Sequence, residues 1–259
     1  MTFPTSPRVI YDKNTLEEVI CQFRFPSILK VTATPPVEFQ ERVRGKYPLY
    51  QEVSTTNVSD LLPGGLPTDL ARLFSGPAST IHDFRSEDST WRVTLSQNAI
   101  ALTCYKYRYW EAFQERFSDI SRALLEIYAP AFYSRIGLRY KNVIRRSLLD
   151  LGGTPWQELL QSHITGELGS SLASNVRQFS GESIIKLSDE NHLVRIRHGL
   201  ADQSDEVSFV IDSDFFTEER TPLNAADSVL EEFHGQSGKF FRWCIHTRLH
   251  DAMGPRAVG

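Results

Sequence analysis

Apolar and polar residues alternate at every second position along several segments of the chain. Segment 17–25 shows the pattern most clearly, with apolar side chains at alternate positions from Val19 to Phe25. Successive side chains of a β-strand point to opposite faces, so this alternation predicts a strand with one buried face. The same reasoning predicts further strands at 91–96, 100–109, 135–144, 183–187, 193–198 and 207–215.

A different spacing marks segment 109–128. Its large apolar residues recur at intervals of three and four: Trp110, Phe113, Phe117, Ile120, Leu124 and Ile127. This spacing places them on one stripe of an α-helix, and such a stripe is typical of a helix packed in the core. Shorter helices are predicted at 36–45 and 155–163, and a longer one at 225–250 is predicted to break between Gly235 and Gly238.

Strands followed by amphipathic helices predict an α+β fold, in which helices pack on one face of a mostly antiparallel sheet. The order strand, strand, helix, strand over 91–144 is similar to a series over 183–250. This similarity indicates a repeated strand-strand-helix-strand unit. We expect one compact unit over 1–259, with candidate sub-units 10–146 and 180–250 joined by 147–179.

Composition narrows the class of protein. The chain has 259 residues, a net charge of −4 and 41% hydrophobic residues, which match a globular protein without general attraction to nucleic acid or anionic membranes. Neither a leader-like N-terminus nor an apolar run of about 18 residues is present. We therefore expect a cytoplasmic protein without a membrane partner. Cys21, Cys104 and Cys244 lie in apolar surroundings and are expected to be buried.

Several segments of the chain are similar to segments of a known protein family. They are 11–25, 36–44 with Tyr47-Pro48, 135–142 and 211–216, together with Trp110 and Phe113. In these residues the chain resembles a sporadically distributed family of uncharacterised bacterial proteins of about 250 residues. The resemblance spans most of the chain and implies a bacterial source and a whole-chain unit. It implies no activity and no catalytic residues.

Basic side chains occupy alternate positions of several predicted strands. The candidate ligand-binding residues are Arg24, Arg135, Arg139, Lys141, Arg195 and Arg197. If these strands share one sheet, the basic groups collect on its helix-free face, where guanidinium donors suit phosphate oxygens. We expect a polyanion site there. The alternative is a solvated face whose basic residues pair with Glu and Asp. For nucleic acid, the candidate base-stacking residues are Tyr105, Tyr107, Tyr109 and Tyr140.

Two sets of residues are candidate metal ligands. Glu18, Asp212 and Asp214 accompany the basic residues, and carboxylates of this kind hold divalent cations. His246 and His250 are four residues apart on one predicted helical face, although histidines at such a boundary commonly have no metal. The sequence contains no Walker loop, Gly-x-Gly-x-x-Gly motif or Cys/His zinc cluster, and it therefore predicts no particular cofactor.

A well-patterned core without a catalytic motif favours a binding or accessory protein. Its partner is expected to be another protein or a polyanionic ligand, contacted by the sheet face or by a Gly- and Pro-rich loop at 61–79. One alternative is a metal-dependent enzyme that handles phosphates or nucleotides through the arginine-rich face. A further alternative is a nucleic-acid-binding protein, which the net charge does not support.

Overall fold

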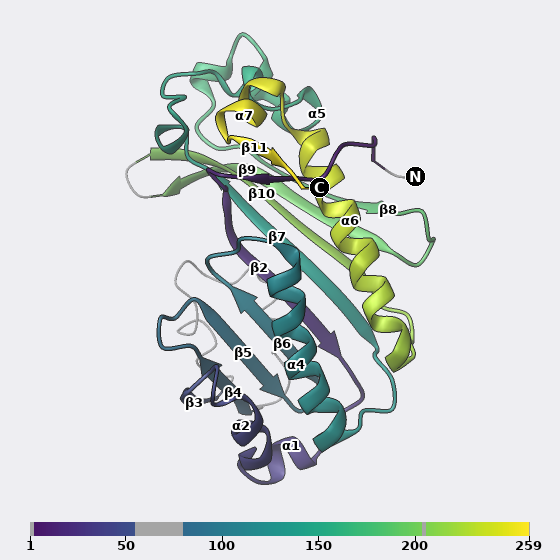
Figure 1. The fold of residues 1–259 in the computed structure, drawn as a ribbon. Helices are drawn as coiled ribbons and strands as arrows, with labels where there is room; N and C mark the ends of the chain where they lie inside the picture. The colour runs from purple at the N-terminus through teal and green to yellow at the C-terminus, as the bar shows by residue number, and fades with distance from the viewer. Residues whose placement is uncertain (1–2, 55–79, 204–205, 259) are drawn as a thin grey trace.

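The computed structural model describes residues 3–54, 80–203 and 206–258. Its main strands are β2 (Leu16–Arg24), β3 (Leu49–Ser54), β4 (Thr80–Arg85), β5 (Trp91–Ser96), β6 (Ala99–Cys104), β7 (Arg135–Ile144), β8 (Ser180–Lys186), β9 (Leu193–Gln203) and β10 (Glu206–Thr217). These strands form one antiparallel sheet in the order β3-β4-β5-β6-β2-β7-β10-β9-β8 (Figure 1). The predicted α+β class is confirmed.

Two long helices lie across the same face of this sheet (Figure 1). The helices are α1 (Lys30–Ala33), α2 (Val37–Val43), α4 (Trp110–Tyr128), α5 (Ser162–Thr165), α6 (Ala226–Cys244) and α7 (Thr247–Ala252). Short 3₁₀ turns are η2 (Ser147–Leu149), η3 (Trp156–Glu158), η4 (Gly166–Gly169), η5 (Ala173–Asn175) and η6 (Leu223–Ala225). None of the described helices has the length and apolar character that a membrane crossing requires.

The apolar stripe predicted for 109–128 is the buried side of α4. Phe113, Phe117 and Ile120 are almost completely buried. Phe117 meets Phe23 of β2 edge-on, with ring centroids 4.7 Å apart. On α6, Phe233 and Phe240 both contact Phe215 of β10, with ring centroids 6.4 and 6.2 Å apart. Burial of such rings is the main stabilising term of the helix–sheet layer.

The strands on the two sides of the central pair β2 and β7 follow a similar order. Moving outward, β2 is followed by β6, β5, β4 and the additional edge strand β3, whereas β7 is followed by β10, β9 and β8. In both halves the central strand comes first in the chain, a meander of strands returns to it, and a long helix follows. The chain therefore builds both halves of the sheet in the same order. The division into sub-units 10–146 and 180–250 stays a prediction.

Several predicted boundaries are wrong. Helix α6 continues through Gly235 and Gly238 and ends only at Cys244, because packing of its apolar side outweighs the weak helix propensity of two glycines. The predicted strand 100–109 ends at Cys104, where the chain turns toward α4. In place of a helix at 155–163, the chain forms the short helical turns η3 and α5.

The two ends of the described chain lie together in a separate two-stranded sheet. Strand β1 (Val9–Tyr11) pairs with β11 (Pro255–Ala257) in antiparallel register. Phe3, just before β1, is buried against Phe240 and Trp243, with ring centroids 5.3 and 5.5 Å apart. These contacts hold the N-terminal segment against α6. The sequence pattern predicted neither strand, since three residues are too few for a visible alternation.

Gly199 provides a test of the sheet geometry. A Cβ atom at this position would lie 2.2 Å from the carbonyl oxygen of Phe179 and 2.8 Å from the Cα of Ser180. Both are backbone atoms and cannot rotate away, so we expect Gly199→Ala to lower the free energy of unfolding by about 2–3 kcal/mol. Urea denaturation measures this change. Gly152→Ala is the matched control, since no atom lies within 4 Å of its added methyl group. Equal stability of the two variants would contradict the described approach of β8 to β9.

Candidate functional site

The predicted basic residues do lie together on the sheet face opposite α4 and α6 (Figure 1), within a regular pattern of charges. One row across five strands reads Glu18, Lys141, Asp212, Arg197, Glu182. The next row reads Ile20, Arg139, Asp214, Arg195, Ile184. Because opposite charges face each other at neighbouring positions, each cation has a carboxylate beside it.

Ion pairs occupy the donors of most of these basic groups. Arg139 binds Asp212 through two parallel bonds of 2.7 and 2.8 Å and also reaches Glu18 at 3.3 Å. Burial opposes the charge of Arg139, but the carboxylates of Asp212, Glu18 and Asp214 together more than offset this effect and raise the Arg139 pKa. The other pairs are Arg135–Asp214 at 2.8 Å, Lys141–Glu17 at 2.8 Å, Arg195–Glu182 at 3.5 Å and Arg197–Glu182 at 3.4 Å.

Arg24 differs from the other five predicted basic residues. It lies directly opposite Arg135 in the β2–β7 register. Burial, together with the nearby Arg135 charge, lowers the pKa of Arg24. Its Nε atom is buried and has no hydrogen-bond partner in the described part of the chain. Arg24 therefore lies at the end of the charge pattern, next to a like charge.

The candidate metal ligands do not form a cluster. Glu18 and Asp212 both bind the Arg139 guanidinium, and Lys141 lies between them in the strand register. His246 Nδ1 is 3.1 Å from the amide nitrogen of Gln161, and His250 Nδ1 is 2.7 Å from the Tyr11 hydroxyl. Within the described ranges, no group of three His, Cys, Asp or Glu side chains is arranged to hold a metal ion.

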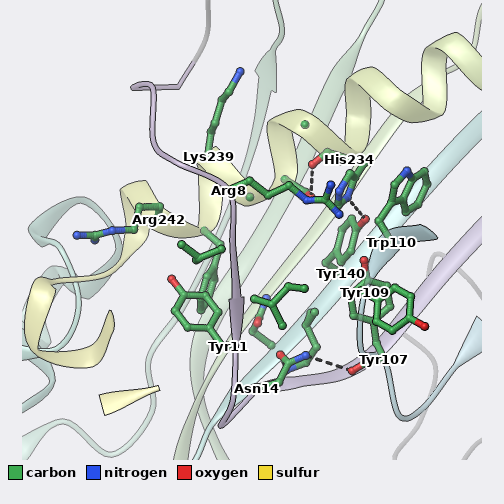
Figure 2. A pocket seen from close by; sticks show the side chains of 18 of the residues that line it. Arg8, Tyr11, Asn14, Tyr107, Tyr109, Trp110, Tyr140, His234, Lys239 and Arg242 are labelled. Atoms are coloured by element: carbon green, nitrogen blue, oxygen red, sulfur yellow. Dashed lines mark hydrogen bonds between the residues drawn. The ribbon is translucent and has the colours of Figure 1, made fainter. Parts of the chain in front are cut away.

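A cavity of about 300 Å³ lies on the opposite, helix-covered side of the sheet (Figure 2). The N-terminal segment 6–11 forms one wall, and residues 234–242 of α6 form another. The turn before α4, at 107–110, borders the cavity, and side chains from β7 and β10 contribute to its lining. The cavity thus lies where both halves of the sheet meet the N-terminal segment and α6.

Aromatic rings and one histidine join these elements. The Tyr140 hydroxyl and His234 Nδ1 are 3.0 Å apart and share a hydrogen bond (Figure 2). His234 stacks on Trp110 with ring centroids 4.5 Å apart and planes 7° from parallel. Tyr107 meets Tyr140 edge-on at 6.0 Å. The Trp110 Nε1 group donates to Glu231 at 2.8 Å. The rings are therefore held in fixed positions by α4, α6 and β7.

These aromatic and imidazole groups are uncharged at neutral pH. Burial, reinforced by the nearby Arg8 charge, lowers the pKa of His234 to about 4. The neutral imidazole can accept a hydrogen bond from the Tyr140 hydroxyl. Burial also raises the pKa of Tyr107 and of Tyr140, so both phenols keep their protons. This part of the cavity consequently offers ring surface and paired polar atoms.

The rim, in contrast, is cationic. It is formed by Arg8, Arg108, Lys239 and Arg242, and no Asp or Glu is found among the described lining residues. Arg8 donates to Glu111 at 2.7 Å, outside the cavity lining. Arg242 donates to the backbone carbonyl of Ile245 at 3.0 Å. Arg108 and Lys239 have no carboxylate partner within residues 3–54, 80–203 and 206–258.

Two glycines keep space open beside α6. Gly235 and Gly238 line the cavity, and a Cβ atom added to either would meet no atom within 4 Å. Each glycine costs about 1 kcal/mol relative to alanine in the interior of a helix. Neither a turn nor close packing requires them here. They therefore reduce helix stability and leave room in the cavity.

The sequence predicted the charged sheet face but not this cavity. Tyr107, Tyr109 and Tyr140 line the cavity, on the face of the sheet opposite to the predicted arginines. Tyr105 is not among its lining residues. The sequence feature that indicates the cavity is the pair of glycines, Gly235 and Gly238, inside an otherwise amphipathic helix. The sequence pattern alone predicts a helix break at these glycines. The predicted loop at 61–79 lies outside the described residues.

No protein-family model matches the chain, and no curated protein is similar to it.

The Arg139–Asp212 pair can be tested by removing one charge. Asp212→Asn leaves the buried Arg139 guanidinium with Glu18 as its remaining carboxylate. We expect a loss of about 2–4 kcal/mol in the free energy of unfolding, because a buried charge without its main partner is costly. Glu38→Gln, which breaks the exposed pair with Lys30, should change stability by a few tenths of a kcal/mol. Similar effects of the two variants would show that the sheet-face pair is solvated.

The low pKa of His234 predicts a pH dependence of stability. Between pH 6.5 and about 4, the unfolded chain binds a proton at this histidine and the folded chain does not. Unfolding is therefore favoured as the pH falls through this window, by up to roughly 3 kcal/mol. His234→Gln should flatten the pH profile measured by urea denaturation between pH 7 and pH 4.5. The other titrating groups are the same in both proteins, so parallel profiles would contradict the assignment.

Proposed function

We propose that this protein is a binding protein for a small anionic molecule with an apolar, ring-containing body, and that the cavity beside α6 is its binding site. One observation carries the proposal. Cations on the sheet face are mostly paired with carboxylates, whereas cations at the cavity rim face a lining without carboxylates. A ligand anion would give Arg108 and Lys239 the negatively charged partner that the described residues do not provide.

The rim supports recognition of negative charge. Lys239 and Arg242 are three residues apart and therefore lie on the same side of α6. Arg8 extends over the cavity toward Trp110 and His234 (Figure 2). Hydrogen bonds from such groups to a carboxylate or phosphate are stronger than those between neutral groups. The rim thus favours anions and disfavours cationic ligands of the same shape.

The interior of the cavity favours a ligand with an apolar body. Tyr107, Tyr140 and Phe241 contribute ring surface, and the two glycines of α6 leave space. The volume of about 300 Å³ is at the lower end of the range for small-molecule sites. Aromatic ligands gain additional stabilisation when they stack on rings or meet their edges. A flat, ring-containing acid therefore fits better than a purely polar one.

The other hypotheses stay predictions. A polyanion or a nucleic acid on the sheet face would have to compete with the carboxylates that already bind Arg135, Arg139 and Lys141. A partner protein and a phosphate-handling enzyme are favoured by no particular contact among the described residues. Membership of the uncharacterised bacterial family and a cytoplasmic location likewise remain predictions.

The test is binding of simple aromatic acids to the purified protein. Phenyl phosphate and phenylacetate should raise the melting temperature and give measurable heats of binding, whereas benzylamine should not. At about 100 times the dissociation constant, a ligand adds roughly 2.7 kcal/mol of stability. Lys239→Gln should weaken phenyl phosphate binding about tenfold or more, through loss of a charge-assisted hydrogen bond.

Two further variants locate the site. Lys46→Gln removes a lysine that pairs with Asp119 and does not line the cavity, so it should leave binding unchanged. Gly238→Leu places a side chain into open space; it should keep the fold and abolish binding. Binding of phenyl phosphate that survives in the folded Gly238→Leu variant would place the ligand elsewhere.

A further inference from the structure

The cavity does not end at its cationic rim. A second hollow, of about 410 Å³, adjoins it and is lined by Pro4, Thr5, Gln161, His163 and Trp243. Four residues line both spaces: Ser6, Pro7, Lys239 and Arg242. The two cationic side chains therefore stand at the junction of the two hollows.

The directions of these side chains support a site at the junction. Lys239 and Arg242 point away from Tyr107 and Tyr140, toward the outer side of the cavity (Figure 2). An anion held by both would consequently lie beyond the tyrosine-lined space, at its boundary with the second hollow. Groups attached to that anion can extend in two directions.

The second hollow also presents ring surface. The His163 ring stacks on Trp243, with centroids 3.7 Å apart and planes 18° from parallel. Burial lowers the pKa of His163, so its imidazole is neutral at neutral pH and contributes a flat, uncharged surface. Like the tyrosine-lined cavity, this hollow can therefore bind a planar group. No Asp or Glu occurs among its described lining residues.

We propose that the ligand carries its negative charge between two planar or apolar groups, as in a phosphodiester. The monoanionic phosphate lies at Lys239 and Arg242, one substituent occupies the tyrosine-lined cavity, and the other rests beside His163 and Trp243. This inference rests on the proposed function, because it specifies the class of anion that the same cavity takes. An acid with its charged group at one end of the molecule would leave the second hollow empty.

Diphenyl phosphate and phenyl phosphate separate the two classes of ligand. Phenyl phosphate carries close to two negative charges at neutral pH, whereas diphenyl phosphate carries one. A site that recognises only the negative charge therefore binds phenyl phosphate more tightly. If the second ring is recognised, diphenyl phosphate should bind about fivefold more tightly, the effect of one additional ring contact. Isothermal titration calorimetry on the full chain measures both dissociation constants.

A variant of the second hollow completes the test. His163→Ala removes an exposed ring and should abolish the preference for diphenyl phosphate while leaving phenyl phosphate binding unchanged. Ser162→Ala, on the same short helix and outside the lining of the hollow, is the matched control. Equal or weaker binding of diphenyl phosphate, or a preference that survives in His163→Ala, would overturn this inference and leave the cavity as a site for simple acids. Failure of both probes to bind would overturn the proposed function as well.

Discussion

Strand β7 is hydrogen-bonded on both sides, and its alternating side chains have to satisfy two different environments. Tyr140 faces the helices and contacts His234, whereas Arg139 and Lys141 face the opposite side and bind carboxylates. A shift of one residue in the register would place guanidinium groups among the rings of the core and tyrosines among the ion pairs. The rest of the structure depends on this register, because β7 joins the two halves of the sheet.

The ion pairs explain how so many cations are accommodated on one sheet face. Carboxylates of β2, β8 and β10 lie beside the basic residues of β7 and β9, and the pairing neutralises the charge within the sheet. Arg135 shows how closely this layer is packed. Its guanidinium lies across Gly137, where a Cβ atom would come within 2.1 Å of it, and it also stacks on Phe216. A buried layer of this kind specifies which strands are neighbours more than it adds stability.

Local patterns predicted the fold well wherever one element has a single buried face. The strand from Leu16 to Arg24 and the helix from Trp110 to Tyr128 follow directly from their periods of two and about 3.6 residues. The basic residues were also expected on one sheet face, since alternation alone places them there. Their carboxylate partners depend on the register between strands, which period-two alternation does not define.

Local sequence patterns could not predict the cavity, because its walls come from distant parts of the chain. Arg8, Tyr107 and Lys239 lie in three separate segments of the chain, and no local pattern relates them. The glycines of α6 illustrate the difficulty. In sequence, Gly235 and Gly238 weaken a helix; only the position of the neighbouring elements shows that they border an open space.

The pairing of β1 with β11 has a consequence for biosynthesis. One wall of the cavity is formed by strand β1, whose partner among the described strands is β11 at residues 255–257. A nascent chain can form the β2–β7 centre long before those residues leave the ribosome, since folding proceeds as synthesis advances. The wall acquires its pairing partner only after the strands of both halves of the sheet have been synthesised, so the binding site is completed after the scaffold that supports it.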